Sequence, residues 1–418
     1  VGSSVNGYVN TLADHDWFAV QLTAGQQYTF TLVRNDGVVD PLLRLRDSAG
    51  TQLAENDDGN GNQGSRIAFA AASTGTFCLD AGAYSDASSG GYTLAVSGPS
   101  TPPPVYTTDQ IAAFLTTGYW GGPVAHWPIG ATITYNVQGL LPAAQVLARA
   151  AFGIWQDALD LTFVETAGAG QITLDDTDSG AYATSQSTGG FTTSATINVQ
   201  PNWSGEATPG LDSYTYQTFI HEIGHTLGLG HGGPYNGNAT YGVDNLYAND
   251  TWAYTIMSYF DQTNYDSGSY REVMTPMIAD IVAVQGIYGA HANVRTGDNT
   301  YGFNSNAGTT YNFLTYTSAP AFTIIDGGGA DTLDASGYNN EQIIDLTAEA
   351  ASSIGGLHDN IFIARGVVIE NSVGGSGADV ITGNAANNIL TGGLGADTLD
   401  GGLGTNTLDG GDGADTAS

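Results

Sequence analysis

The chain has 418 residues and a formal net charge of −33, because 41 acidic residues stand against eight basic ones, all of them arginine. This acidity excludes nucleic acid and anionic membranes as partners and favours divalent cations, which carboxylates bind. The length gives room for two or three domains, and no run of eighteen apolar residues predicts a membrane span.

Short alternating apolar runs fill residues 1–97 and predict strands. The runs at 18–22 and 28–32, with "TAGQQ" between them, are typical of a β-hairpin. Further runs at "RIAFAA", "TFCLDA" and "YTLAV" are separated by Gly, Asn, Asp and Ser. Together they predict an N-terminal β-sandwich.

Two polar features of this region have alternative interpretations. The acidic pairs Asp14 with Asp16, and Asn56 to Asp58, fit solvated turns better than calcium sites. The single cysteine, Cys78, lies in a strand pattern, which favours a small strand residue over a thiolate that caps a zinc. Because one cysteine forms no intrachain disulfide, stability outside a cell would need another source, such as bound metal.

The proline-rich stretch "GPSTPPPV", residues 98–105, predicts a semi-rigid linker. Mixed helix and strand signals follow over residues 106–292 and predict an α+β domain. Asp109 opens a helix at "DQIAAFLTT" and Pro142 opens a longer one. Strands are expected at "LTFVET", "QITLDD" and "ATINVQ", then a histidine-bearing helix and a last helix at "PMIADIVAVQGIYG".

The stretch "HEIGHTLGLGH" contains three of the chain's seven histidines. His221 and His225 are four residues apart, so on a helix both imidazoles project from one face. Gly228 lets the chain turn back, which brings His231 in as a third ligand and leaves an open position on a zinc ion. Glu222 can then act as the general base on a water during attack on a carbonyl.

Five nonapeptide repeats begin at Gly374 and follow the pattern Gly-Gly-x-Gly-x-Asp-x-aliphatic-x, which predicts a parallel β-roll over residues 293–418 that binds calcium. Successive turns alternate between two edges. The turns that start at Gly374, Gly392 and Gly410 carry Asp379, Asp397 and Asp415, and we call these turns the Asp edge. The turns that start at Gly383 and Gly401 carry Asn388 and Asn406, and we call them the Asn edge. We expect calcium to bind more tightly at the Asp edge, since carboxylates attract it more than amides do.

Several stretches are similar to known families. "DHDWFAVQLTAGQQYTFTL" and "DPLLRLRDSAGTQLAENDDG" resemble the bacterial pre-peptidase C-terminal domain, an accessory module of secreted proteases, here placed at the N-terminal end. "YQTFIHEIGHTLGLGH", "TIMSYF" and "VIENSVGGSGADVITGN" resemble the serralysin branch of the metzincin zinc peptidases over residues 106–418. One departure is Gly232, where that family often has proline. The repeats also stop at Ser418 without the family's further strands and secretion signal, so we expect a truncated or processed chain.

The resemblance implies roles for further residues. Met257 would form the apolar floor of the Met-turn below the histidines, and Tyr259 would ligate the resting zinc and then hydrogen-bond the oxyanion of the intermediate. It also implies that calcium joins the catalytic and repeat domains. With the repeats, the expected calcium ligands are Arg295, Gly297, Asn299, Asp326, Gly328, Gly329, Asp331, Val368, Glu370, Gly375, Gly377, Asp379, Asn384, Ala386, Asn388, Gly392, Leu394, Asp397 and Asp415.

The functional hypothesis is a secreted bacterial zinc endopeptidase, stabilised by several calcium ions, monomeric and delivered by type I export. We expect extended substrates to pair antiparallel with an edge strand near residues 179–186, which gives broad specificity. The alternative is a calcium-dependent surface or adhesion protein with a vestigial protease fold. Intact Glu222 and Tyr259 argue against that alternative, because a scaffold needs neither.

Overall fold

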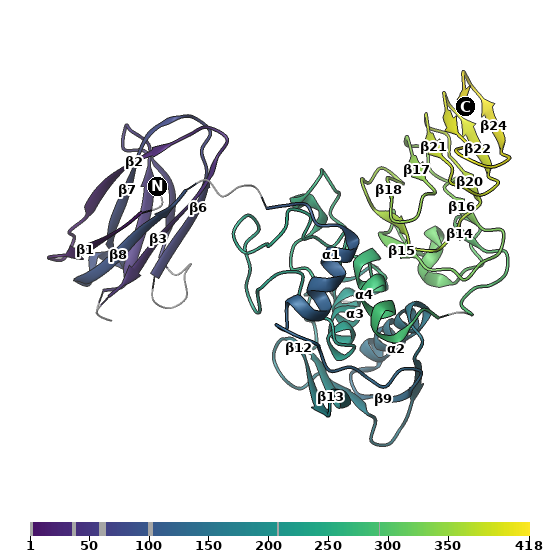
Figure 1. Cartoon of the computed structure of the whole chain (residues 1–418), viewed down its shortest axis with the longest axis horizontal. Helices are drawn as coiled ribbons and strands as arrows, with labels where there is room; N and C mark the ends of the chain where they lie inside the picture. The colour runs from purple at the N-terminus through teal and green to yellow at the C-terminus, as the bar shows by residue number, and fades with distance from the viewer. Residues whose placement is uncertain (1–2, 36–38, 58–63, 99–102, 207–208, 292) are drawn as a thin grey trace. The chain divides into compact units, whose positions relative to one another are not determined.

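The computed structural model divides into two compact units (Figure 1). The first unit is Val1–Pro104 with Thr240–Asn245, and the second is Val105–Ala239 with Leu246–Ser418. The structure describes residues 3–35, 39–57, 64–98, 103–206, 209–291 and 293–418. Asp58 of the predicted acidic cluster and residues 99–102 of the predicted linker lie outside the described residues.

The first unit contains two antiparallel sheets of four strands each, with the orders β1-β8-β3-β6 and β2-β7-β4-β5. Side chains from both sheets, such as Phe30 and Leu94 from one and Leu45 and Leu79 from the other, form one buried core. Cys78 lies half-buried on β7, as predicted. The strands are β1 (Ser3–Val9), β2 (Asp16–Leu22), β3 (Gln27–Arg34), β4 (Pro41–Arg46), β5 (Gln52–Asn56), β6 (Gly64–Ala70), β7 (Gly75–Ala83) and β8 (Gly90–Ser97).

The predicted hairpin between residues 18–22 and 28–32 is wrong. Both runs are strands, but β2 pairs with β7 whereas β3 pairs with β6 and β8 in the other sheet. The connection therefore crosses from sheet to sheet, and Gly25 N–H donates to the carbonyl of Ala71 at 2.7 Å. The alternating pattern identified correctly which side chains face the core, but it carries no information about the partner strand.

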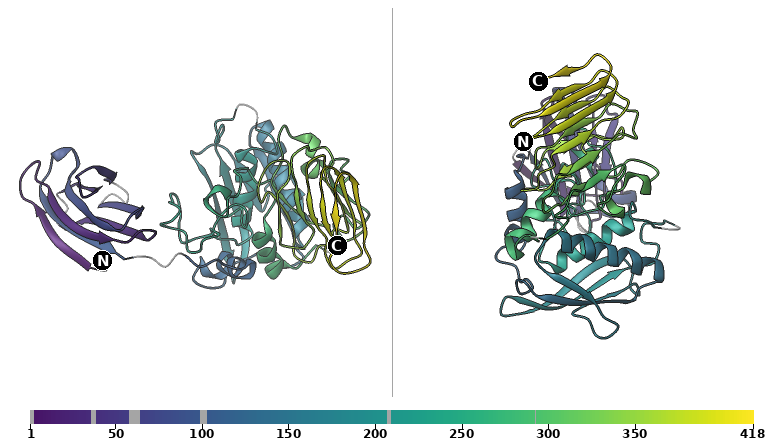
Figure 2. Two further views of the ribbon diagram at one scale, coloured as in Figure 1. Left: turned by 90° about the horizontal axis from the view of Figure 1, so that it is seen from above. Right: turned by 90° about the vertical axis from the view of Figure 1, so that its right-hand side faces the viewer.

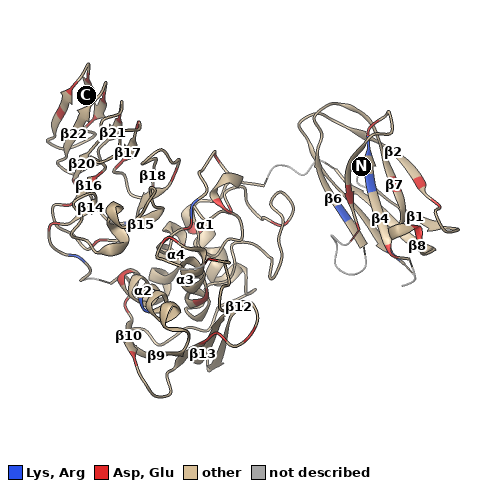
Figure 3. Cartoon of the chain, turned by 180° about the vertical axis from the view of Figure 1, so that it is seen from behind, with Lys and Arg blue, Asp and Glu red and all other residues tan. Residues whose placement is uncertain are grey.

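A network of charged side chains crosses the sheet that contains β2 and β7. The buried carboxylate of Asp80 bonds His15 Nδ1 at 2.6 Å and Arg46 Nε at 2.9 Å. Asp86 Oδ1 lies 3.0 Å from His15 Nε2, and the guanidinium of Arg46 lies 5.4 Å from the centre of the Trp17 ring. Burial lowers the pKa of His15, but its hydrogen bonds and charge attraction to Asp80 and Asp86 raise that pKa overall. Arginines such as Arg46 are few along the chain, whereas acidic residues are spread over it (Figure 3).

The network predicts that the first unit loses stability as the pH rises through neutrality. Because the folded-state pKa of His15 lies above its unfolded value, the stabilisation is complete below about pH 6.5 and is lost as the pH passes the raised pKa. Hydrogen exchange of the β2 and β7 amides in the full chain should therefore be faster at pH 8 than at pH 6.5, after correction for the intrinsic rate. His15→Gln should abolish this difference, and a variant that keeps it would contradict the assignment.

In the second unit, helices α2 and α3 lie against a five-stranded sheet of the order β10-β9-β11-β13-β12. The first helix begins at Thr108 rather than Asp109, because Thr107 and Gln110 form a capping box. β12 is antiparallel to β13 and lies at the sheet edge, as the sequence predicted for residues 179–186. The elements are α1 (Thr108–Ala113), which continues as a π-helix (Phe114–Gly118), β9 (Thr132–Gly139), α2 (Pro142–Ala158), β10 (Thr162–Glu165), β11 (Ile172–Asp175), β12 (Ala181–Thr188), β13 (Phe191–Val199), α3 (Tyr214–Thr226) and α4 (Ile278–Tyr288). None of the described helices is long and apolar enough to cross a membrane.

The region after α4 contains short strands, most of them paired in parallel, that stack in one direction (Figure 2). Strands that pair are eighteen residues apart in the repeats, as Asn371 with Ile389 and Val380 with Thr398 show. The strands are β14 (Thr300–Gly302), β15 (Phe322–Ile324), β16 (Thr332–Asp334), β17 (Ile343–Asp345), β18 (Ala351–Ser352), β19 (Ile361–Ile363), β20 (Asn371–Val373), β21 (Val380–Thr382), β22 (Ile389–Leu394), β23 (Thr398–Asp400), β24 (Thr407–Asp412) and β25 (Thr416–Ala417).

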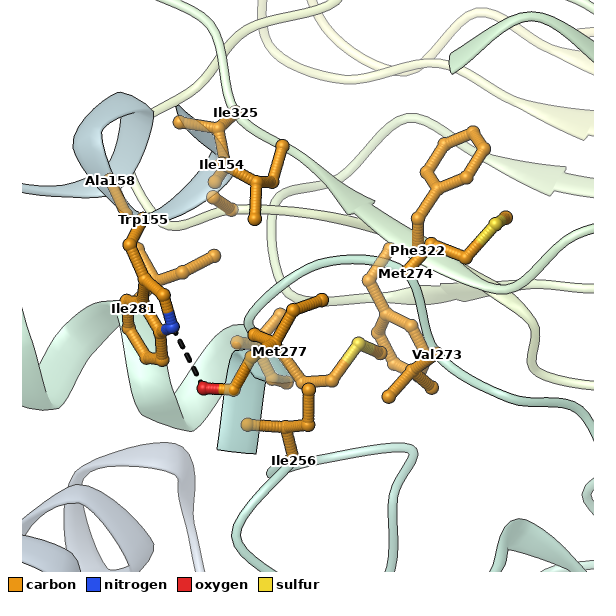
Figure 4. Close-up of a cluster of buried hydrophobic side chains, with 14 of the residues drawn as sticks. Ile154, Trp155, Ala158, Ile256, Val273, Met274, Met277, Ile281, Phe322 and Ile325 are labelled. Atoms are coloured by element: carbon orange, nitrogen blue, oxygen red, sulfur yellow. Dashed lines mark hydrogen bonds between the residues drawn. The ribbon is translucent and has the colours of Figure 1, made fainter. Parts of the chain in front are cut away.

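One apolar core runs through the second unit and supports the loop after α3. In Figure 4 Ile256 of this loop lies next to Met277, within a buried cluster that also contains Trp155 of α2 and Phe322 of β15. The indole N–H of Trp155 donates to the carbonyl of Ile220 at 2.9 Å and fixes α2 to α3.

Asp280, near the start of α4, binds the same loop with a fully buried carboxylate. It accepts hydrogen bonds from Thr255 Oγ1 (2.5 Å), Ile256 N (2.7 Å) and Met277 N (2.8 Å). Burial raises the pKa of Asp280 to about 7.

Asp280→Ala should lower the melting temperature of the second unit by at least about 4 °C, because three buried donors lose their acceptor. Asp280→Asn keeps one acceptor oxygen and should lose less. Calorimetry of the full chain gives the melting temperature of the second unit in the wild type, Asp280→Ala and Asp280→Asn. Equal melting temperatures in these three proteins would refute the role of Asp280.

Candidate metal centre

Helix α3 positions the first two histidines of the motif. It begins after Ser213, whose hydroxyl accepts from Tyr216 N at 3.1 Å, and it ends one residue after His225. Gly228 then adopts a φ of 99°, which favours glycine, and the chain turns back to place His231 beside the helix. Ligand nitrogens of the three histidines lie within 4.8 Å of one another.

Backbone carbonyls orient all three imidazoles. The Nδ1 atoms of His221, His225 and His231 bond the carbonyls of Ile256, Leu229 and Tyr235 at 2.9, 2.8 and 2.9 Å. Since a carbonyl only accepts, each Nδ1 carries the proton and each Nε2 presents a lone pair. His225 Nε2 and His231 Nε2 are 3.1 Å apart, so two lone pairs face each other. A metal cation between them would satisfy both, and the donor set therefore fits zinc.

The environment keeps these imidazoles neutral, which is the form that binds metal. Burial lowers the pKa of His225 to about 4 and that of His231 to about 3, helped for His231 by the neighbouring charge of His225. Burial also holds the pKa of His221 well below its usual range.

Glu222 follows the first histidine and is 5% exposed. Burial raises the pKa of its carboxyl to about 8, and among the described residues its Oε2 has no hydrogen-bond partner. Its carboxyl lines the same cleft as the histidines, where it can accept or donate a proton.

Met257 and Tyr259 both lie close to the three histidines. Met257 is fully buried, and its sulfur packs against Gly224 of α3, between the first two histidines in sequence. The hydroxyl of Tyr259 lies 3.1 Å from His231 Nε2 and accepts a hydrogen bond from Gly237 N at 3.3 Å. The phenol is therefore adjacent to the position that a metal would take.

The histidines and Glu222 open into a cleft of about 1210 Å³. Gly180 and residues 181–183 of the edge strand β12 form part of its wall, and Trp203, Tyr214 and Trp252 add aromatic side chains. Within the described part of the chain, β12 is the outermost strand of its sheet, so one strand edge lies beside the histidines.

Sequence reasoning missed residues that contact this site from distant segments. Trp120 donates to the carbonyl of Gly228 at 3.0 Å, and Tyr119 Oη lies 3.2 Å from His231 Nδ1. Asp280 had a visible signal, a carboxylate within the apolar run "MIADIV", which points to a buried hydrogen-bonded role. Tyr119 and Trp120 had no such signal.

The carboxylates of the Asp edge form a ladder along the stacked turns. Asp379 Oδ1 accepts from Gln342 N at 2.7 Å, Asp397 Oδ1 from Asp379 N at 2.8 Å, and Asp415 Oδ1 from Asp397 N at 3.0 Å. Asp397 Oδ2 is buried and has no partner within the described part of the chain. Asp379 Oδ2 accepts from Gly375 N.

The amide groups of the Asn edge form hydrogen bonds with other groups of the chain. Asn388 N donates to Asn406 Oδ1 at 2.9 Å, and Asn388 Nδ2 donates to the carbonyl of Glu370 at 2.9 Å. Asn384 Oδ1 accepts from Ala386 N at 2.9 Å. The remaining ligands expected in the repeats, Gly377, Gly392 and Leu394, lie in turns of the Asp edge, where Leu394 N donates to the carbonyl of Gly375.

The earlier group of expected calcium ligands is only partly brought together. Asp331 joins Asn299 and Glu370, since its Oδ1 accepts from Asn299 N at 2.7 Å and its N–H donates to Glu370 Oε2 at 2.8 Å. Burial and the nearby carboxylates of Asp326 and Glu370 raise the pKa of Asp331. Val368, another expected ligand of this group, has a side chain that is 44% exposed.

Other members of this group lie in two adjoining loops. Gly297 and Gly329 face each other closely, and Gly328 N donates to Asp326 Oδ1 at 2.6 Å. The guanidinium of Arg295 bonds Asp157 of α2 at 2.8 Å. Because a guanidinium is cationic and has no acceptor atom, only the backbone carbonyl of Arg295 can be a calcium ligand. Among the described residues, the histidine triad is the one cluster of three or more His, Cys, Asp or Glu side chains that converges.

Three family models match successive parts of the chain. Residues 14–98 match the bacterial pre-peptidase C-terminal domain, residues 166–287 the reprolysin-like metallopeptidase family M12B, and residues 290–416 the peptidase M10 serralysin C-terminal model.

Named relatives agree with these matches. Metallopeptidase AprA of Pseudomonas marginalis is 42% identical over 264 residues, 58% of this chain and 55% of that protein. Serralysin of Proteus mirabilis is 45% identical over 44% of this chain and 39% of its own length, so the chain spans about half or less of these two relatives. Serralysin G of Dickeya chrysanthemi is 35% identical over 347 residues, 72% of both chains. With this coverage and identity, the chain belongs to the serralysin family of metalloproteases.

Proposed function

We propose that the protein is a secreted zinc endopeptidase whose single zinc ion is held by His221, His225 and His231. The observation that carries this proposal is the 3.1 Å approach of two Nε2 atoms whose protons are on the other ring nitrogens. When bound, zinc supplies a Lewis acid that polarises a carbonyl and acidifies a coordinated water.

Residues around the triad supply the other parts of peptide hydrolysis. Glu222 takes the proton of the attacking water and passes it to the leaving nitrogen, since it lines the cleft beside the histidines and its carboxyl has an oxygen without a partner among the described residues. Tyr259 donates a hydrogen bond to the oxyanion, because its hydroxyl lies beside His231. Met257 supports the triad from below as an apolar floor.

Substrates bind as extended chains antiparallel to β12. This strand is at the sheet edge and lines the cleft, so main-chain hydrogen bonds provide most of the recognition and the specificity is broad. Export by a type I system and a monomeric state complete the proposal.

The remaining parts have structural roles in this proposal. Residues 1–97 form a β-sandwich, 98–105 a linker, 106–292 the catalytic domain and 293–418 a calcium-binding β-roll. Calcium neutralises the stacked carboxylates, in particular the unpartnered oxygens of Asp331 and Asp397. An adhesion protein with a vestigial site is not favoured, because such a protein has no use for the buried Glu222 beside three oriented histidines.

Glu222→Gln should keep its zinc while losing about 10²- to 10⁴-fold in peptidase activity, since it removes the proton acceptor. Cleavage of a denatured protein substrate and metal analysis give the two measurements. Glu165→Gln, which changes a surface glutamate paired with Arg149, serves as the matched control and should retain activity. Full activity of Glu222→Gln would overturn the mechanism.

Asp397→Asn should raise the calcium concentration needed to fold the C-terminal region, because it replaces an unpartnered buried carboxylate with an amide. Asn388→Ala on the Asn edge should raise it less. Far-UV circular dichroism of the full chain during a calcium titration compares the two midpoints. A midpoint that is the same in both variants and the wild type would contradict the Asp-edge site.

A further inference from the structure

A buried tyrosine–aspartate pair lies directly behind the third histidine. Tyr235 is 5% exposed and Asp250 is fully buried. The Tyr235 hydroxyl lies 3.0 and 3.1 Å from the two carboxylate oxygens of Asp250, to which it donates. Asp250 is outside the converging histidine group, so the pair is no part of the proposed metal-ligand set.

Tyr235 contacts both His231 and Tyr259. Its carbonyl accepts from His231 Nδ1 at 2.9 Å, while its hydroxyl accepts from Tyr259 N at 3.3 Å. Its ring centre lies 4.8 Å from that of Tyr259 and 5.8 Å from that of His231. One side chain therefore connects a proposed zinc ligand with the proposed oxyanion donor.

The loop that follows His231 is packed around this pair. A β-carbon at Gly232 would overlap Asp250 Oδ1, so the carboxylate packs directly against the backbone of this glycine. Gly232 N also donates to the carbonyl of Met257 at 3.0 Å. The loop after the third histidine and the loop of Met257 and Tyr259 are thus joined at Gly232, which packs against Asp250.

We propose that Tyr235 and Asp250 form a positioning pair that fixes the backbone of Tyr259 relative to His231. Asp250 orients the Tyr235 hydroxyl by accepting its hydrogen bond. The hydroxyl proton then points to the carboxylate of Asp250, and a lone pair of the hydroxyl oxygen points to Tyr259 N–H. The Tyr259 phenol can then change position about a fixed backbone. This inference rests on the proposed function, because Tyr259 matters only if the site hydrolyses peptides.

Tyr235→Phe tests the pair with the smallest change. It keeps the ring and the carbonyl that holds His231 but removes the hydroxyl between Asp250 and Tyr259. We expect kcat for a peptide substrate to fall about three- to tenfold, the worth of one hydrogen bond, with KM unchanged. Zinc affinity, measured by competition with a chelator, should match the wild type.

Asp250 variants show whether the two residues act as a unit. Asp250→Ala should lower kcat as much as Tyr235→Phe, and the double variant no further, because both remove the same restraint. Asp250→Asn keeps an acceptor and should restore most of kcat. Tyr92→Phe is the control, since it removes a tyrosine–aspartate hydrogen bond to Asp16 in the first unit and should leave kcat unchanged.

The proposed positioning role would be overturned if folded Tyr235→Phe had an unchanged kcat. It would also be overturned if the kcat losses of the two single variants were additive in the double variant. A fall in zinc affinity in Tyr235→Phe would also overturn it, because the hydroxyl would then act on the ligand loop. Tyr235→Phe alone decides the question if Asp250→Ala does not fold. A wild type that cleaves no peptide would instead refute the proposed function.

Discussion

The arrangement of the site depends on one kind of interaction, the hydrogen bond from each imidazole Nδ1 to a backbone carbonyl. These three bonds fix which nitrogen carries the proton and leave the Nε2 lone pairs of His225 and His231 facing each other. Two facing lone pairs in a buried space are unfavourable without a cation. Folding thus prepares a site that is complete only when metal binds.

Buried carboxylates form hydrogen bonds with two of the residues that carry these carbonyls. Asp280 accepts from Ile256 N–H, and the carbonyl of Ile256 then faces His221. Asp250 is hydrogen-bonded to the side chain of Tyr235, whose carbonyl faces His231. Irregular loops need such acceptors, because their backbone donors have no strand or helix partner. Asp280, which lies outside the motif, therefore supports His221, whereas Asp250 bonds the Tyr235 hydroxyl and not the carbonyl that orients His231.

The sequence correctly predicted the features that depend on residues close together along the chain. The spacing of His221 and His225 on a helix, the turn at Gly228 and the eighteen-residue pairing of the repeats all follow from short-range periodicity. Partner choice was not predictable in this way, so the run after β2 was wrongly taken as its hairpin partner. Asp250 escaped notice for the same reason, since its partner Tyr235 is fifteen residues away in a segment without periodicity.

The ladder of the Asp edge has a direction. Each carboxylate caps the backbone of a turn that precedes it in sequence, from Asp397 to Asp379 and from Asp379 to Gln342. A chain that emerges N-terminus first from a ribosome lacks the cap of a turn in these repeats until the turn eighteen residues later has emerged. Order within the repeats should therefore trail behind synthesis by about two repeats, so the most recently made segment stays extended while earlier turns are completed.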